Sequence, residues 1–324
     1  MVKLSAAAIV ERLDELGLSH RTLRMQTEGE YLPTDVDWNN KDVPHLNEVH
    51  SLVNDVTCVI DRHLQASISL QKVAGITCPL ILVHYDAETD HQTHFVTLLA
   101  WTMVTDHEFI PLSPTRTRAV TTYHVCATRF WLLFWPLIKA LLRRNYRQLM
   151  SEDVPLRERR GRLRSWGYSF RGDGELRDIR ASLNIHANNV FPPDPPAGDP
   201  PVFAPVPVDD IAADRCTFLG RSDHLGLMLK RDGGQVLAFA RLCPHEGAEM
   251  DAVAVADGCQ VCPWHGRELA PLAVDDLGDE TPRADTAWHH LEVVDGTLEV
   301  TVTNPGPARR RPARAQVTSG PPDA

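Results

Sequence analysis

The chain has 324 residues, 43% hydrophobic and 23% charged, which is enough for two ordinary globular domains. Its formal net charge of −10 argues against a nucleic-acid partner. No apolar run reaches the about 18 residues of a membrane span, no signal peptide is recognisable, and the seven cysteines show no paired framework, so we expect a cytoplasmic protein.

The N-terminal region alternates in the manner of antiparallel strands after a short amphipathic helix at residues 2–16. Stretches rich in Val, Thr, Leu and Tyr predict strands at Ile76–Tyr85, Thr93–Thr105 and Arg116–Ala127. A helical pattern then runs from residue 130 to about 166, with an interruption expected near residue 151. A sheet followed by a long closing helix predicts a curved sheet around that helix, with an apolar cavity between them.

Two further expectations concern apolar side chains of this region. The cavity is expected to be lined at alternating positions by Ile81, Val83, Phe95, Thr97, Leu99 and Trp101, which favours a largely apolar substrate. The run from Phe130 to Ile138 is too short to span a bilayer, and we expect a buried helix rather than a membrane-surface one.

A first candidate metal site is the motif Asp42-Val-Pro-His45-Leu-Asn-Glu-Val-His50. Two histidines and one carboxylate leave open positions for O₂ on non-haem Fe(II). Because His45 and His50 are five residues apart, they face one metal only if the helix is distorted or ends there. The alternative is a purely structural role, in which Asp42 caps a helix N-terminus and the two histidines are unrelated.

A third ligand for this site has to come from elsewhere in the chain. Glu152 and Asp153 follow Ser151 at a point where the helical pattern restarts. Acids in a first helical turn are also what the helix dipole favours, so this match has a structural explanation as well.

The clearest boundary is the proline-rich stretch at residues 192–207, which predicts an extended spacer. We therefore expect an N-terminal domain over residues 1–191, a second domain over 208–304 and a disordered tail over 305–324. In the second domain, apolar runs flank Asp232-Gly-Gly and Asp295-Gly296, and both predict β-hairpins.

The second domain carries the most specific motif of the chain. Cys243-Pro-His245 is followed, after sixteen intervening residues, by Cys262-Pro-Trp-His265. Two thiolates on one iron and two imidazoles on the other hold a Rieske [2Fe–2S] cluster, which passes single electrons. Cys259 adds a C-x2-C step, so a structural zinc knuckle is the alternative, although zinc ribbons favour two C-x2-C pairs.

These loops resemble the Rieske domains of ring-hydroxylating oxygenases and Rieske ferredoxins. The cytochrome bc type has an extra Cys in each loop, where this chain has Ala248 and Trp264. Together with D-x2-H-x4-H and the later Glu-Asp, the chain resembles Rieske non-haem iron oxygenases, whose catalytic domain is a START-like helix-grip fold. It departs from them in having the Rieske domain last and a short catalytic part.

The resemblance implies particular roles for these residues. His45, His50 and Asp153 would bind a mononuclear Fe(II), with Glu152 as the alternative carboxylate. Asp42 would bridge a cluster histidine and an iron-binding histidine, which would fix both tautomers. It also implies subunits arranged in a trimer-like ring, with electrons crossing between neighbours.

We therefore expect an α+β chain with an N-terminal helix-grip domain and a small all-β Rieske domain. The expected function is that of a terminal oxygenase component, oxidising an apolar substrate by monooxygenation, dihydroxylation or desaturation. No nucleotide-binding motif is present, so a separate reductase or ferredoxin is the expected electron donor. The alternatives are a Rieske electron carrier fused to a lipid- or isoprenoid-binding module without mononuclear iron, and a redox sensor.

Overall fold

A computed structural model of the protein describes residues 4–60, 64–73, 76–88, 91–98, 100–165, 170, 201–256, 258–275 and 289–302. The expected linker therefore lies outside the described residues up to 200, and the expected tail lies wholly outside them.

The N-terminal half is built on one antiparallel sheet of seven strands in the order β1-β7-β6-β5-β4-β3-β2. Each strand from β2 to β7 pairs with the next along the chain, and β1 closes the sheet beside β7. The strands are β1 Ser19–Gly29, β2 Val53–Ile60, β3 Leu64–Val73, β4 Ile76–Glu88, β5 His91–Leu98, β6 Trp101–Ser113 and β7 Arg116–Ala127.

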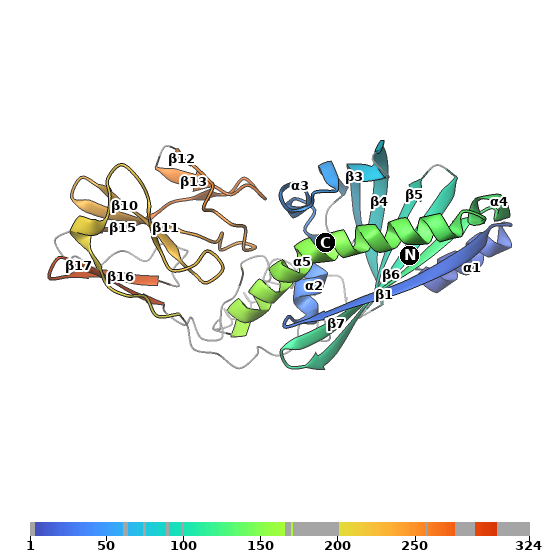
Figure 1. Ribbon diagram of the computed structural model, residues 1–324, viewed down its shortest axis with the longest axis horizontal. Coiled ribbons are helices and arrows are strands. Elements are labelled where there is room, and N and C mark those ends of the chain that lie inside the picture. Colours follow the sequence, from blue (N-terminus) through green and yellow to red (C-terminus); the bar gives the residue numbers. More distant parts are fainter. Residues whose placement is uncertain are drawn as a thin grey trace, which may run out of the picture.

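The described part of the chain has five α-helices around this sheet: α1 Ala6–Glu15, α2 Pro33–Lys41, α3 His45–Val49, α4 Arg129–Leu132 and α5 Trp135–Ser165. α1 packs Ala6 and Val10 against Val104 of β6 and Cys126 of β7, as its amphipathic pattern predicts. The 31-residue α5 crosses the other face and extends toward the second half of the molecule (Figure 1). The expected helix-grip architecture is therefore present.

Two predicted boundaries were wrong. The expected strand Thr93–Thr105 is a hairpin, because Leu98 of β5 pairs directly with Trp101 of β6. The expected helix break near Ser151 is absent, and α5 continues through Pro155. The interruption lies earlier, between α4 and α5. Polar and proline residues therefore suggested a boundary that tertiary packing overrides.

The prediction of the cavity-lining face was wrong in β4 and β5. Their apolar residues at the cavity under α5 are Leu80, Leu82 and Val96, which are neighbours of the expected Ile81, Val83, Phe95 and Thr97, and Ile81 is instead 61% exposed. In β6, Met103 lines the cavity, and the expected Trp101 lies on the same face, where it packs beside Trp135 and Ile138 of α5. The expected Leu99 lies outside the described residues. Successive strand residues point to opposite faces, so an error of one position inverts the assignment of a strand.

The aromatic run that begins α4 and α5 is exposed, contrary to the expectation of a buried helix. Its exposed members are Phe130, Trp131, Leu133, Phe134 and Leu137. Leu132 and Ile138 face the sheet instead and pack on Val125 and Ala127. The described helices include none whose length and hydropathy would let it cross a membrane.

The C-terminal half is an all-β domain of three small antiparallel sheets. Its strands are β8 Val206–Pro207, β9 Thr217–Leu219, β10 Leu227–Asp232, β11 Gln235–Ala240, β12 Val255–Ala256, β13 Cys259–Val261, β14 Glu268–Leu269, β15 Leu272–Asp275, β16 His289–Val294 and β17 Thr297–Val302, with a 3₁₀ turn at Val208–Asp210. Both predicted hairpins are confirmed, β10 with β11 and β16 with β17. Asp295 and Gly296 both have positive φ, as a tight two-residue hairpin turn requires.

The end of α5 joins the two halves. Leu163 is fully buried against Leu225 and Leu242 of the β-domain. One turn before it, the buried guanidinium of Arg160 donates to the backbone carbonyl and the carboxylate of Glu246, at 2.8 and 3.0 Å. Arg159 donates to the carbonyl of Gly247 at 2.6 Å. The tip of the β-domain is thereby held against the N-terminal half.

Candidate functional site

The two cysteine loops of the β-domain have the same backbone geometry. In each loop the cysteine N–H donates to the carbonyl five residues later, Cys243 to Ala248 and Cys262 to Arg267, both at 2.8 Å. The glycine four residues after each cysteine adopts positive φ and donates back to the cysteine carbonyl. The loops therefore form a matched pair that presents one Cys and one His each.

Within this pair, the histidines converge and the cysteine sulfurs are buried. The Nδ1 atoms of His245 and His265 lie 3.4 Å apart, so the two imidazoles present the same nitrogen to a shared point. The Cys243 thiol donates a hydrogen bond to Cys262, which lowers the pKa of Cys262 and raises that of Cys243. Two cysteines and two histidines are the donor set of a Rieske cluster, so these residues fit the group.

A second group of prospective ligands lies in the N-terminal half. The ligand atoms of His45, His50 and Asp153 all lie within 4.8 Å of one another, and all three residues are buried. Among the described residues no other His, Cys, Asp or Glu set gathers so tightly, the four cluster-loop residues included.

Local structure explains how His45 and His50 meet despite their spacing. α3 ends at Val49, and His50 has extended backbone with φ −94° and ψ 115°. The ring centroids of the two histidines are consequently 5.3 Å apart. The requirement that the helix end between them is met.

The contacts of His50 place its two ring nitrogens against two different carboxylates. His50 Nδ1 lies 2.9 Å from the Glu152 carboxylate, which fixes the proton on that nitrogen. His50 Nε2 lies 3.1 Å from Asp153 Oδ1, so a proton or a metal ion has to lie between the two atoms. Two imidazoles and a carboxylate are donors that suit a divalent metal. Glu152 therefore orients the His50 ring through Nδ1 and is not one of the three residues whose ligand atoms converge.

His45 is oriented by the residue expected to be the bridge. Its Nδ1 donates to the backbone carbonyl of Asp42, and its Nε2 lies 3.9 Å from Asp153 Oδ1. The Asp42 carboxylate is 3.6 Å from His45 Nδ1 and accepts from His265 Nε2 at 2.9 Å. Asp42 therefore contacts both histidines, with its side chain on His265 and its main chain on His45.

Electrostatic interactions favour the charged forms of two histidines and two aspartates at these sites. Burial alone would lower the pKa of His45, but its contacts with Asp153 and Asp42 outweigh burial and raise it to about 9. The same balance raises the pKa of His265 to about 10, with Asp42 as the main partner. The pKa of Asp42 and that of Asp153 are correspondingly depressed despite burial. Each imidazole is thus paired with an ionised carboxylate.

Several residues at this site were not anticipated from the sequence. Asn39 donates to Asp153 Oδ1 at 3.0 Å and lies 3.2 Å from His45 Nε2, while its own oxygen accepts from Arg157 at 2.8 Å. Arg157 follows Asp153 by four residues, a spacing that was available as a signal. Asn39 carried no such signal, because only α2 packing on α5 brings it there.

Aromatic rings fill the junction between the two sites. Trp264, which lies between Cys262 and His265 in its loop, stacks on Trp38 at 6.0 Å between centroids and lies 5.8 Å from His45. These rings lie beside the loop that carries His265 and pack the Rieske domain against the N-terminal site.

Residues 204–278 match the family model described as the Rieske [2Fe-2S] domain. This segment is a Rieske domain. The match includes all four predicted cluster residues, and the electron-transfer role typical of such domains follows from it. No curated protein is similar enough over the chain to count as a relative.

Solved structures resemble the N-terminal half. A START superfamily protein from Mycobacterium smegmatis is 11% identical, with 43% of this chain and 98% of that chain covered and a TM-score of 0.37. The Zhui aromatase/cyclase from Streptomyces sp. R1128 is 15% identical, with 44% and 96% covered and a TM-score of 0.39. Norcoclaurine synthase from Thalictrum flavum is 8% identical, with 43% and 94% covered and a TM-score of 0.37. The fold assignment rests on strand order and the long helix rather than on these scores.

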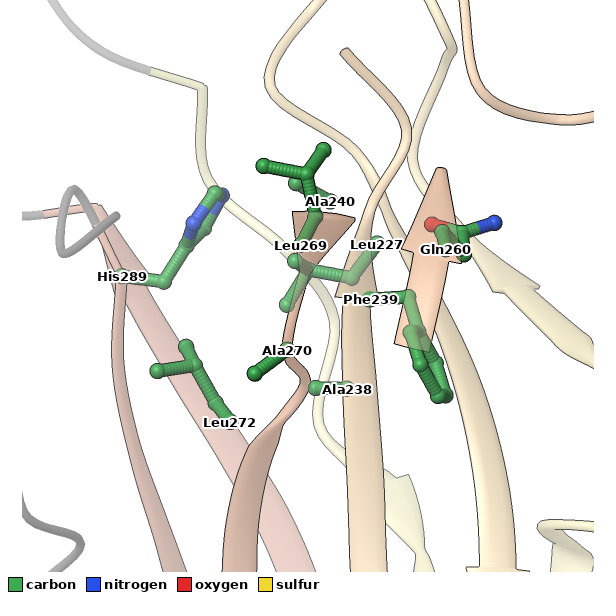
Figure 2. Close-up of a pocket in the computed structure, with 9 residues that line it drawn as sticks. All are labelled: Leu227, Ala238, Phe239, Ala240, Gln260, Leu269, Ala270, Leu272 and His289. Carbon is green, nitrogen blue, oxygen red and sulfur yellow. The ribbon is translucent and has the colours of Figure 1, made fainter. Parts of the chain in front are cut away.

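Two cavities differ in what they can hold. Figure 2 shows a space inside the Rieske domain, with His289 and Gln260 on opposite sides of a mostly apolar lining. It measures about 10 Å³, and His289 donates to the Leu225 carbonyl at 2.6 Å, so it is a gap in a packed core. The cavity under α5 measures about 240 Å³ and includes His50 and Asp153 in its lining. It is the space where a ligand could reach the metal-binding group.

Proposed function

We propose that the chain is the terminal component of an oxygenase, which accepts electrons from a separate reductase or ferredoxin at its Rieske domain and oxidises a largely apolar substrate with O₂. Cys243, His245, Cys262 and His265 would hold the [2Fe–2S] cluster, and His45, His50 and Asp153 a mononuclear Fe(II). When bound, the cluster supplies single electrons and the ferrous ion activates O₂.

The observation that carries the proposal is the convergence of three buried ligand atoms at the wall of a mostly apolar cavity. Groups of acidic residues are common on protein surfaces, but here His45, His50 and Asp153 are all buried, where polar groups are costly unless they have partners.

The chain's own residues perform three tasks in this proposal. Glu152 and the Asp42 carbonyl fix the tautomers of His50 and His45, so that each offers Nε2 to the metal. Arg157 and Asn39 hold Asp153 in place. Asp42 accepts a hydrogen bond from His265 Nε2 and thereby connects the two metal-binding groups within a single chain.

The test is metal and sulfide analysis of anaerobically purified protein, with electron paramagnetic resonance before and after dithionite and nitric oxide. We expect about three irons to two sulfides and a separate ferrous nitrosyl signal. His50→Ala should lose the nitrosyl signal and retain the Rieske signal, whereas His290→Ala, which alters an exposed histidine of β16, should lose neither.

About two irons to two sulfides after reconstitution with Fe(II), without a nitrosyl signal, would refute the oxygenase. That result would leave an electron carrier fused to a ligand-binding domain.

A further inference from the structure

Three histidines form a row across the middle of the sheet. His84 of β4 lies directly opposite His94 of β5, with ring centroids 4.7 Å apart. His107 of β6 lies two residues beyond Thr105, the partner of His94, and its ring centroid is 4.3 Å from that of His94. β4, β5 and β6 are the adjacent strands that α5 crosses in Figure 1. The row therefore belongs to the same face of the sheet as the cavity.

The row has hydrogen-bonding capacity that the described residues do not use. Both ring nitrogens of His84 and Nε2 of His94 are buried without a partner among those residues. His107 Nδ1 shares a hydrogen bond with the Thr121 hydroxyl at 3.2 Å. A buried polar atom left without a partner costs about 1–3 kcal/mol, and Nε2 of His94 belongs to a residue that lines the cavity, so a ligand there would relieve this cost.

The rings are uncharged at neutral pH. Burial lowers the pKa of His84 to about 4, against a weaker opposing effect of Asp37. Burial, then the nearby Arg157, lowers the pKa of His107 to about 3. Burial, then its two histidine neighbours, places the pKa of His94 well below its ordinary value. A neutral imidazole offers one N–H donor and one acceptor lone pair.

His94 and His107 line the cavity that also contains His50 and Asp153, and most of the remaining lining is apolar. We propose that His94, backed by His84 and flanked by His107, binds an uncharged oxygen, a hydroxyl or carbonyl, on an otherwise apolar substrate. The inference rests on the proposed function in so far as it takes this cavity as the substrate site.

Two other ligands fit the row less well. A single metal ion would need three ligand atoms as close as those of His45, His50 and Asp153, and the row does not meet that condition. A carboxylate would need a cation, but the nearby Arg157 is already committed to Asn39 and Asp153. A neutral oxygen needs only the donor and acceptor that imidazole provides.

The test compares 1-naphthol with naphthalene, two probes that differ by one hydroxyl, by anaerobic equilibrium dialysis against the purified full-length protein without reductant. We expect the wild type to bind 1-naphthol about ten-fold more tightly, as one buried hydrogen bond allows. His94→Leu should remove this preference and bind naphthalene at least as well. His124→Leu, on the opposite face of β7, should retain it.

Equal affinity for the two probes in the wild type, or an unchanged preference in His94→Leu, would overturn the inference. His94→Gln, which keeps a donor and an acceptor, should preserve the preference and guards against a folding defect in the leucine variant. Uptake of one further Zn²⁺ by the wild type, lost in His94→Leu, would also overturn it by showing a metal site. Dialysis requires no iron, so the two proposals can fail separately. If the protein shows no ferrous site after reconstitution with Fe(II) but still prefers 1-naphthol, the oxygenase is refuted and the role of His94 stands.

Discussion

Replacing Arg160 by Met should weaken the contact between the two halves of the molecule. The Arg160 side chain is 2% exposed, and it bonds Glu246 at 2.8 and 3.0 Å and lies 3.4 Å from Asp35. Its guanidinium also stacks over Trp38 and Phe170, 3.8 and 3.9 Å from their ring centroids. Removing one member of a buried charged network costs about 3–5 kcal/mol, since the remaining carboxylates keep their desolvation penalty.

Urea unfolding followed by tryptophan fluorescence measures this loss, because Trp38 and Trp264 stack across the junction. With a dependence on urea of about 3 kcal/mol per molar, the first transition should shift by about 1–1.7 M. Arg143→Met changes an exposed arginine of the same helix and should shift it by less than about 0.2 M. Equal shifts in the two variants would refute the claim that Arg160 holds the junction.

Two further predictions concern the Asp42 connection. Asp42→Asn keeps the shape of the side chain but weakens its hydrogen bond to His265. Product formed in a single turnover from pre-reduced protein should then appear about 10- to 100-fold more slowly, although dithionite still reduces the cluster fully. An unchanged rate would remove Asp42 from the electron-transfer path. In metal-free protein the raised pKa of His45 stabilises the fold fully below pH 6.5, and this stability, about 3 kcal/mol, should be lost as pH rises from 6.5 through about 9. Urea titrations at pH 6 and 9 should show the decline, which should vanish in His45→Gln and in iron-loaded protein, since the metal requires neutral imidazole.

The parts that could be predicted from the sequence are those fixed by local geometry. The Rieske loops carry their ligands within a few residues of one another, so Cys243 and Cys262 identified them directly. The His45 and His50 pair was recognisable because its spacing demanded a helix end, which the structure provides at Val49. These motifs need no knowledge of distant partners.

The wrong predictions concern features that depend on packing between distant parts of the chain. Which strand face lines the cavity depends on register, and Ile81 was assigned to the wrong side. Asn39 reaches Asp153 only because α2 packs on α5, across more than a hundred residues of chain. The exposed Phe130 run shows the same limit, because an apolar sequence does not state whether the fold covers it.

The Asp42–His265 hydrogen bond joins the two halves of one polypeptide. The proposed electron route from the cluster to the mononuclear iron therefore does not require that the chain forms an oligomer. A donor and an acceptor on separate chains meet at a frequency set by their concentrations, whereas covalently linked partners face each other at a fixed, high effective concentration. Under the proposed roles, each chain carries its own complete route in one-to-one stoichiometry. With the separate electron donor held in excess, turnover per molecule should therefore stay constant on dilution, even where any larger assembly dissociates.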